Sequence, residues 1–290
     1  MADPLPISYL NGEYVPLREA RISPLDRGFL YSDGVYEVMP VYEGRPFRFE
    51  AHAERLTRSL AGIQMEDPHT RIEWREIIST LITRNGGGNQ YVYWQVTRGA
   101  EFGRNHAPLP KIPRTVFAFC APLPPITAAT LENGVACVTT EDTRWAYCDI
   151  KSVSLLANVL LRQQSTDAGA AETILLKDGQ LREASASAVH VVINGEIISP
   201  PRARSILPGT TRSAMEEVAA SAGVPLRSAP VSEQQLRSAD EIWLTASTRE
   251  VQAVTTLDGK PVGNGKPGPV WRRVHEAWQR YKQSLVGKPW

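Results

Sequence analysis

The sequence has few cysteines, no long apolar run and almost no net charge, so it lacks the features typical of secreted, membrane-bound and nucleic-acid-binding proteins in turn. Its three cysteines, Cys120, Cys137 and Cys148, form no CxxC pair, so we expect free thiols in a reducing, cytoplasmic compartment. It contains no run of about 18 apolar residues, and its first nine residues carry neither a basic nor an apolar stretch. We therefore expect no membrane span and no signal peptide. The 32 basic and 31 acidic residues nearly cancel, so no nucleic acid or membrane partner is expected.

Common catalytic motifs are also missing. There is no GxxxxGK[ST], GxGxxG, GxSxG or HExxH segment, and the five histidines lack metal-ligand spacing, so we expect no metal site. Lysine is scarce: the 290 residues contain seven, and the first 110 contain none. Chemistry that needs a lysine amine therefore has few candidates.

The apolar residues that are present follow helical and strand periods. Helical spacing predicts helices at 50–62, 70–85, 155–168, 211–222 and 269–285. Strand patterns predict hairpins at 7–15 and 34–49, and strands at 90–97, 115–120, 134–140, 173–177, 188–193, 196–199, 241–245 and 251–257. Turns are predicted at Asn11-Gly12, Glu43-Gly44, Asp178-Gly179 and Asn194-Gly195.

A proline-rich stretch interrupts this pattern. Residues 122–126 read PLPPI, and proline stiffens a chain while removing hydrogen-bond donors. Strands and helices interleave on both sides of it. We therefore expect two α/β domains, residues 1–121 and 129–290, joined by a linker at 122–128.

Two segments could hold a charged small molecule. Lys151 has apolar residues on both sides, so burial could lower its pKa and make the amine a nucleophile; it could equally extend from the end of an element into solvent. Leu207–Arg212 reads LPGTTR before an apolar-periodic run. Its free N–H groups and hydroxyls suit a phosphate, although threonines also cap helices in that position.

Two further segments could either bind a ligand or be ordinary loops. Glu183–Ser187 combines one carboxylate with small residues, which would admit a flat ligand or form a plain surface loop. Arg104 and His106 lie in a loop at 99–110 bounded by glycine and proline. They could grip a carboxylate together or could simply be solvated.

In this order along the chain, these segments resemble one family. The sequence resembles the fold-type IV pyridoxal-phosphate enzymes, and the D-amino-acid transaminases most closely, from about Tyr9 to about Trp278. The resemblance rests on Asp26-Arg27-Gly28, Asp33–Val38, His52–Leu56, Arg144-Trp145, Cys148–Ser152, Glu183, Leu207–Arg212 and Thr245–Thr248. It implies a smaller N-terminal α/β domain and a larger C-terminal α/β domain with a barrel-like sheet.

The resemblance also implies how pyridoxal 5′-phosphate is bound. Lys151 would bind the cofactor aldehyde as a Schiff base and then carry the substrate proton. Glu183 would face the ring nitrogen, and Arg55 would bind the phosphate. The remaining contacts would come from Leu207 against the ring and from Thr210, Thr211 and Ser247 at the phosphate.

Three other residues resemble the carboxylate-binding set of D-amino-acid transaminases: Tyr36, Arg104 and His106. In that family the loop arginine and histidine reach in from the other subunit, so a homodimer with its active site at the interface is implied. The expected reaction is ping-pong transamination between D-amino acids such as D-alanine and 2-oxo acids such as 2-oxoglutarate.

Other reactions on the same fold stay open, namely transamination of branched-chain L-amino acids or (R)-amines and elimination of pyruvate from aminodeoxychorismate. A non-catalytic binder is a further alternative, but it would not need Lys151, Glu183 and Arg55 together. The small-residue segment departs from the family pattern at Ala184 and Ala188, and the Thr245–Thr248 segment departs from it at Ala246. These changes remove hydrogen-bonding groups around the cofactor and substrate. The side-chain preference, the acceptor, the pathway and any assembly beyond a dimer cannot be predicted from the sequence.

Overall fold

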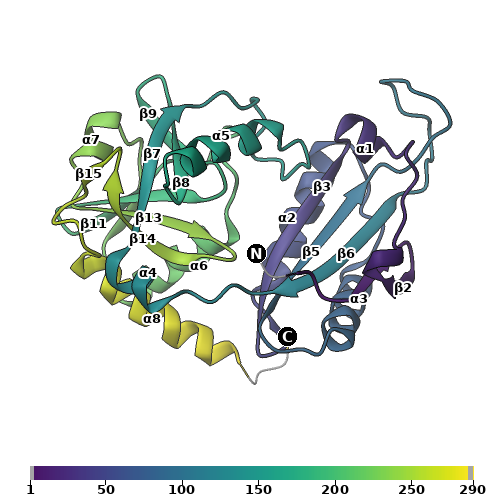
Figure 1. Cartoon of the computed structure of the whole chain (residues 1–290), viewed down its shortest axis with the longest axis horizontal. Coiled ribbons are helices and arrows are strands. Elements are labelled where there is room, and N and C mark those ends of the chain that lie inside the picture. Colours follow the sequence, from purple (N-terminus) through teal and green to yellow (C-terminus); the bar gives the residue numbers. More distant parts are fainter. Residues whose placement is uncertain (1–2, 287–289) are drawn as a thin grey trace. The chain divides into compact units, whose positions relative to one another are not determined.

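The chain folds into two compact units. A computed structural model describes residues 3–286 and 290. The first unit contains the chain up to Pro124, the segment Ile150–Ser154 and the described residues from Leu285 on (Figure 1). The second unit contains Pro125–Asp149 and Leu155–Ser284. The first unit thus includes a short segment that lies in the middle of the second unit's sequence.

An antiparallel sheet forms the first unit. Its six strands are β1 (Ile7–Leu10), β2 (Glu13–Pro16), β3 (Gly34–Tyr42), β4 (Arg45–Pro46), β5 (Gln90–Thr97) and β6 (Thr115–Pro122). They are arranged in the order β2-β1-β6-β5-β3-β4. The helical segments are η1 (Leu17–Glu19), α1 (Arg27–Tyr31), α2 (Phe49–Gly62) and α3 (Arg71–Arg84).

The two faces of this sheet differ. One face packs on α2 and α3, because alternate residues such as Val35, Met39 and Trp94 join the buried core. The opposite face carries aromatic rings: the Tyr36 and Tyr93 centroids are 5.4 Å apart, and those of Tyr93 and Phe119 are 5.1 Å apart. Strand β3 therefore presents Tyr36 away from the helix-packed core.

The second unit is built on a larger mixed sheet. Its strands are β7 (Val135–Glu141), β8 (Glu172–Lys177), β9 (Gln180–Ala184), β10 (Ala188–Ile193), β11 (Glu196–Ser199), β12 (Leu226–Ser228), β13 (Glu241–Ala246), β14 (Glu250–Leu257) and β15 (Lys260–Pro261). The order is β12-β11-β10-β13-β14-β7-β8-β9, with β15 on β14, and β7 pairs in parallel with both β14 and β8.

The sheet of the second unit is curled like a half-barrel around its own core. Residues of strands far apart in the order, including Ile174, Val191 and Leu244, share that core. The helices are α4 (Ala128–Asn133), α5 (Leu156–Asp167), α6 (Thr210–Ser221), α7 (Glu233–Arg237) and α8 (Pro269–Leu285). Helix α5 packs against β7 and β8, whereas α6 packs against β13 and β14.

The predicted turns and long helices are present. All four predicted turn dipeptides have positive φ at both residues, as does Asp258-Gly259, which was not predicted. The five predicted helices correspond to α2, α3, α5, α6 and α8 with ends shifted by at most one residue. In contrast, α1, α4, α7, β9, β12 and β15 were not predicted.

The predicted domain limits at residues 121 and 129 stay a prediction, and their outer ends at 1–2 and 287–289 lie outside the described residues. Among the described residues, none of the helices combines the length and the apolar character needed to cross a membrane.

Candidate active site

Lys151 lies beside strand β3 in the first unit. The Tyr36 N–H donates to Lys151 O (3.0 Å), the Val153 N–H donates to Gly34 O (3.0 Å), and the Lys151 N–H donates to Ser59 Oγ of α2 (3.1 Å). The Lys151 segment therefore pairs with β3 like a short additional strand. Its Nζ lies 4.1 Å from the Tyr36 ring centroid, within cation–π range. The structure thus brings together Lys151 and Tyr36, two of the residues that the sequence singled out.

A buried ion pair fixes Arg55. Strand β3 turns Glu37 towards α2, where Arg55 Nε and Nη2 donate to its two carboxylate oxygens, both at 2.7 Å. His52 Nδ1 lies 2.8 Å from Glu37 Oε2. Burial alone would raise the pKa of Glu37, but the Arg55 guanidinium and the hydrogen bonds from Arg55 and His52 lower it to about 2. Burial lowers the pKa of His52, so we assign a neutral ring whose Nδ1–H donates to Glu37.

A second buried carboxyl lies in the second unit. Glu183 lies near the end of strand β9, accepts from Arg144 Nη1 (2.6 Å) and lies 3.2 Å from the Leu207 N–H. Asp142 holds Arg144 through two parallel bonds, Nε to Oδ1 (2.9 Å) and Nη2 to Oδ2 (2.8 Å). Burial raises the pKa of Glu183 to about 7, although the Arg144 ion pair opposes this rise. A carboxyl with such a pKa can share a proton with a ring nitrogen at neutral pH.

The small residues after Glu183 form a buried turn rather than a surface loop. Fully buried Glu172 accepts hydrogen bonds from the hydroxyls of Ser185 and Ser187, the latter at 3.0 Å. The Ala184 N–H donates to Ser187 O (2.7 Å), which closes the turn. These two hydroxyls are therefore engaged within the protein, and the turn holds the end of β9 that carries Glu183.

Helix α6 begins at the predicted phosphate-binding segment. Gly209 precedes the helix, and both Thr210 and Thr211 are buried in its first turn. Arg212 Nη1 donates to Pro200 O (2.8 Å) and Nε to Glu216 Oε1 (2.7 Å), which anchors that turn. Leu207 is half-buried before the helix. The first N–H groups of a helix have no partner inside it, so this end suits an anion.

Ser247 follows β13 and is half-buried. The end of β13 is held by buried His190, whose ring nitrogens lie 2.7 Å from Ser199 Oγ and 3.0 Å from Thr245 Oγ1. Burial lowers the pKa of His190 to about 3, so its ring stays neutral and bridges the two hydroxyls.

The loop at 99–110 holds Arg104 and His106 on the surface of the first unit. Both side chains are exposed. The Arg104 guanidinium lies 5.2 Å from the Tyr31 ring centroid, and the His106 ring lies 5.5 Å from the same ring. Within the first unit, the structure groups these two residues around Tyr31 of α1.

Several charged residues of these groups were not singled out from the sequence as site residues. Glu37, His52, Arg144 and Asp142 are buried and paired. Only Glu37 gives a local signal, because it stands among apolar residues on the core side of a strand. His52 pairs with Glu37, 15 positions away, and the Asp142–Arg144 pair gains its place in the site only through Glu183, 39 positions from Arg144. Within residues 3–286 and 290, no cluster of His, Cys, Asp and Glu could hold a metal ion.

The residues of each unit fit parts of pyridoxal 5′-phosphate. In the first unit, the Lys151 amine lies against the Tyr36 ring, and Arg55 of helix α2 is held in place by Glu37. The second unit contains a buried carboxyl with a pKa near neutrality and a helix N-terminus with threonine hydroxyls. These groups match the cofactor's aldehyde, phosphate and ring nitrogen in chemical type.

Comparisons with known proteins agree with the predicted family. The amino-transferase class IV family matches residues 34–257. A D-alanine aminotransferase of Staphylococcus haemolyticus is 34% identical over 277 residues, which is 95% of this chain and 98% of the relative. A D-alanine aminotransferase of Listeria monocytogenes is 35% identical over 269 residues, 92% of this chain and 93% of the relative.

Solved structures agree on the fold. A T.th. branched-chain amino acid aminotransferase with pyridoxamine 5′-phosphate has a TM-score of 0.89 and 27% identity, covering 98% of this chain and 95% of that one. The Escherichia coli branched-chain amino acid aminotransferase has a TM-score of 0.89 at 23% identity, covering 99% and 97%. The predicted fold-type IV architecture is confirmed, and the chain belongs to the class IV aminotransferases, enzymes that use pyridoxal phosphate.

Proposed function

We propose that this enzyme transfers the amino group between D-amino acids such as D-alanine and 2-oxo acids such as 2-oxoglutarate. The observation that carries the proposal is the placement of Lys151, whose Nζ lies on the Tyr36 ring while its backbone is paired to β3. The relatives named D-alanine aminotransferase, which match over more than nine-tenths of the chain, support the D-amino-acid substrate.

Seven residues would hold the cofactor in this proposal. Lys151 binds its aldehyde, and Glu183 faces its ring nitrogen. The other contacts come from Arg55, Leu207, Thr210, Thr211 and Ser247. When bound, pyridoxal phosphate supplies an electron sink for the electrons that leave the substrate Cα.

The protein supplies proton transfer and orientation. Lys151 Nζ takes the proton from the substrate Cα and returns one in the reverse half-reaction. Glu183 keeps a proton near the ring nitrogen, since its pKa of about 7 allows it to share one. Glu37 keeps Arg55 in one orientation through two hydrogen bonds of 2.7 Å. The two substrates react in turn, which gives ping-pong kinetics.

The substrate carboxylate is bound by Tyr36, Arg104 and His106 in the same proposal. The active enzyme is a homodimer in which Arg104 and His106 serve the site of the other subunit. Both side chains are exposed, and neither has a carboxylate partner within the described residues of its own unit, which supports a role outside it. The buried, unpaired cysteines support a cytoplasmic location.

A second candidate is transamination of branched-chain L-amino acids. It is favoured by the structural similarity to the T.th. enzyme, with a TM-score of 0.89. The Arg104-x-His106 pair favours the D-amino-acid candidate, because it resembles the carboxylate-binding pair of D-amino-acid transaminases, whereas branched-chain transaminases use that loop differently.

One assay separates these candidates. Purified enzyme with pyridoxal phosphate is given D-alanine and 2-oxoglutarate, and the glutamate formed is resolved by chiral chromatography. We expect D-glutamate and pyruvate, with no glutamate from L-leucine. Formation of L-glutamate from L-leucine would instead establish the branched-chain activity. Turnover of (R)-1-phenylethylamine, or of aminodeoxychorismate without an acceptor, would indicate the other two reactions on this fold.

Lysine variants provide the matched control. Lys151→Ala should abolish turnover, whereas Lys177→Ala, which removes an exposed lysine paired with Glu141, should leave it unchanged. Borohydride treatment followed by mass spectrometry should place the cofactor on the peptide that contains Lys151. Cofactor found on any other lysine would overturn the assignment.

A further inference from the structure

The middle of the loop that carries Arg104 and His106 contains no buried apolar side chain. Every residue from 102 to 111 is exposed, and the Phe102 side chain is 99% exposed. A cleft of about 550 Å³ is lined on one side by 62–64 at the end of α2 and on the other by 108–111 of the loop. Apart from the contacts of Arg104 and His106 with the Tyr31 ring, no packing from the described part of the chain holds the middle of this loop, and the conformation of its backbone depends on polar contacts.

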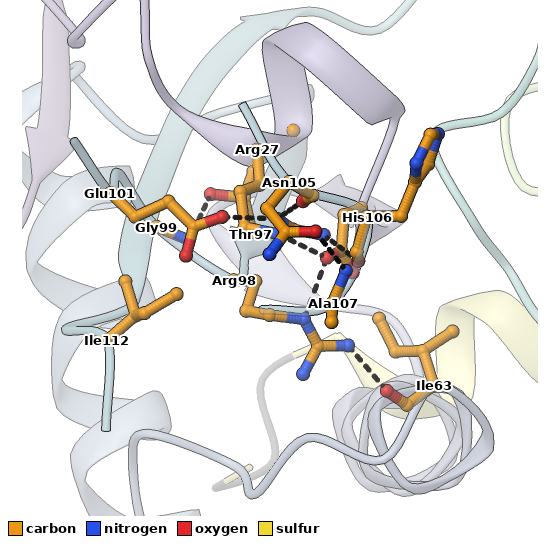
Figure 2. A network of polar contacts seen from close by, with 12 residues as sticks. Arg27, Ile63, Thr97, Arg98, Gly99, Glu101, Asn105, His106, Ala107 and Ile112 are labelled. Carbon is orange, nitrogen blue, oxygen red and sulfur yellow. Dashed lines mark hydrogen bonds and ion pairs between the residues drawn. The ribbon is translucent and has the colours of Figure 1, made fainter. Parts of the chain in front are cut away.

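Buried Arg27 supplies those polar contacts (Figure 2). Its Nη1 donates to Asn105 O (2.6 Å) and its Nη2 to His106 O (2.9 Å). Nη1 also contacts the carboxylate of Glu101, whose other oxygen accepts from the Leu109 N–H (2.9 Å). One guanidinium thus binds the two carbonyls that follow Arg104 and, through Glu101, the far side of the loop.

Arg27 is itself fixed by its surroundings. Its Nε donates to Asp33 Oδ2 (2.9 Å), directly before β3. Asp26 caps α1 by accepting from the Gly28 N–H (2.8 Å). A Cβ at Gly28 would lie 2.3 Å from Thr97 Cγ2, so only glycine lets α1 approach β5 this closely. Each residue of the Asp26-Arg27-Gly28 segment therefore has a distinct physical role, and Arg27 is the one that reaches the loop.

We infer that Arg27 is a positioning residue for the substrate carboxylate. It fixes the backbone at Asn105 and His106, and this presents the side chains of Arg104 and His106 in one geometry. The inference rests on the proposed function, because it assigns those two side chains to the carboxylate. Arg27 itself is buried, so in this inference it acts through the loop backbone and not by binding the substrate.

Kinetics of a double-mutant cycle test this role. Arg27→Met roughly keeps the length of the side chain but removes every donor, so the KM for D-alanine should rise about tenfold or more while kcat changes far less. Arg104→Met should also raise the KM. In a background that carries both Arg104→Met and His106→Asn, adding Arg27→Met should raise the KM by no more than about twofold, because both side chains that Arg27 positions are already gone. Additive effects in the cycle would overturn the inference.

Trypsin provides a readout that needs no substrate, since it cleaves after Arg104 and Lys111. Arg27→Met should speed cleavage in this loop about tenfold or more. Arg98→Met is the matched control: Arg98 also donates to Asp33 Oδ2 (2.7 Å), but its other donors reach the end of α2 and not Asn105 or His106. It should leave both the loop cleavage and the KM close to those of the wild type.

If Arg27→Met does not fold, Arg27→Lys replaces it in both measurements, since a lysine keeps the charge beside Asp33 but cannot bind both carbonyls. A partial rise in KM with faster cleavage is then expected. Wild-type protein without activity on D-alanine would contradict the proposed function. Equal trypsin cleavage of the variant and the wild type would contradict the positioning role independently.

Discussion

Glu37 is a carboxylate that stays charged although it is fully buried. Its folded pKa of about 2 lies below the ordinary value of 4.5 because Arg55 and His52 hold it. A depressed carboxyl pKa contributes stability that is fully present above pH 4.5 and is lost as the pH falls towards 2. The shift corresponds to about 3 kcal/mol of unfolding free energy over that window.

Glu37→Gln should remove this pH dependence. The variant should be about 3–5 kcal/mol less stable at neutral pH, since the buried Arg55 guanidinium loses the negative charge of Glu37. Its stability should then fall less steeply than that of the wild type below pH 4.5. Urea unfolding at a series of pH values measures both effects. Glu54→Gln, an exposed change on the neighbouring helix α2, should run parallel to the wild type; equal slopes for Glu37→Gln and the wild type would contradict the prediction.

Glu183→Gln should reduce kcat without the same effect on folding. A glutamine cannot hold the proton that the ring nitrogen needs, and losing one preorganised electrostatic group costs about 10²–10³ in rate. Steady-state kinetics together with the cofactor content per chain measure the effect. Glu196→Gln, which changes a carboxyl of β11 outside the proposed site, is the control. A variant that keeps its full kcat would remove Glu183 from the proposed site.

Among single residues, the sequence identified those that their neighbours in the chain mark as unusual. It did not identify as site residues those whose role depends on a partner far along the chain. Lys151 stood out because lysines are scarce, and the neighbours of Arg104 marked a loop. Arg144 gave no such signal, since its role depends on Glu183, 39 positions away. Arg27 likewise reaches across 78 and 79 positions to the loop carbonyls. Sequence periodicity does not report contacts of that range.

Helix α3 shows how local chemistry sets an element. The Thr70 side chain accepts from the Glu73 N–H, and the Glu73 side chain accepts from the Thr70 N–H, which forms a capping box. Its apolar residues repeat at helical spacing, and this predicted the helix. Helices α1 and α7 have five residues each, too few to show a period, so the sequence could not predict them.

Thr70→Ala should lower the free energy of unfolding by about 1 kcal/mol, since the start of α3 loses its cap. Catalysis should be unaffected because α3 carries no proposed site residue. Urea unfolding alongside the transaminase assay checks both expectations. Thr83→Ala, an exposed change near the other end of the same helix, should cost nothing, because alanine is the better helix former. Equal stabilities of the two variants would contradict the role of the cap.

On the scale of the whole molecule, the return of Ile150–Ser154 to the first unit is the feature that no local pattern predicts. Lys151 pairs with β3 over a sequence distance of more than 100 residues. The interleaving of strands and helices was enough to predict two α/β domains, but pairing across the chain is settled by tertiary contacts. In the proposed dimer, site residues would likewise be placed by contacts that no local pattern predicts, in that case by contacts between two chains.

Mixed dimers test whether the site is shared. Lys151→Ala and Arg104→Met should each be nearly inactive as homodimers at low D-alanine. After equal mixing, denaturation and refolding, half of the dimers are hybrids, and each hybrid has one intact site if the loop acts in trans. Activity should return to about a quarter of the wild-type value. No recovery, with dimers seen by light scattering, would show that the loop serves its own subunit.

The three buried cysteines can report when each unit opens, because each unit contains at least one of them. Cys120 lies in the core of the first unit, and Cys137 and Cys148 lie in the second. Burial raises the pKa of Cys120 and of Cys137 to about 12 and that of Cys148 to about 11, so none reacts while folded. Alkylation read by mass spectrometry therefore times the opening of the two units separately. A molecule in which both units open together would label all three thiols at one rate.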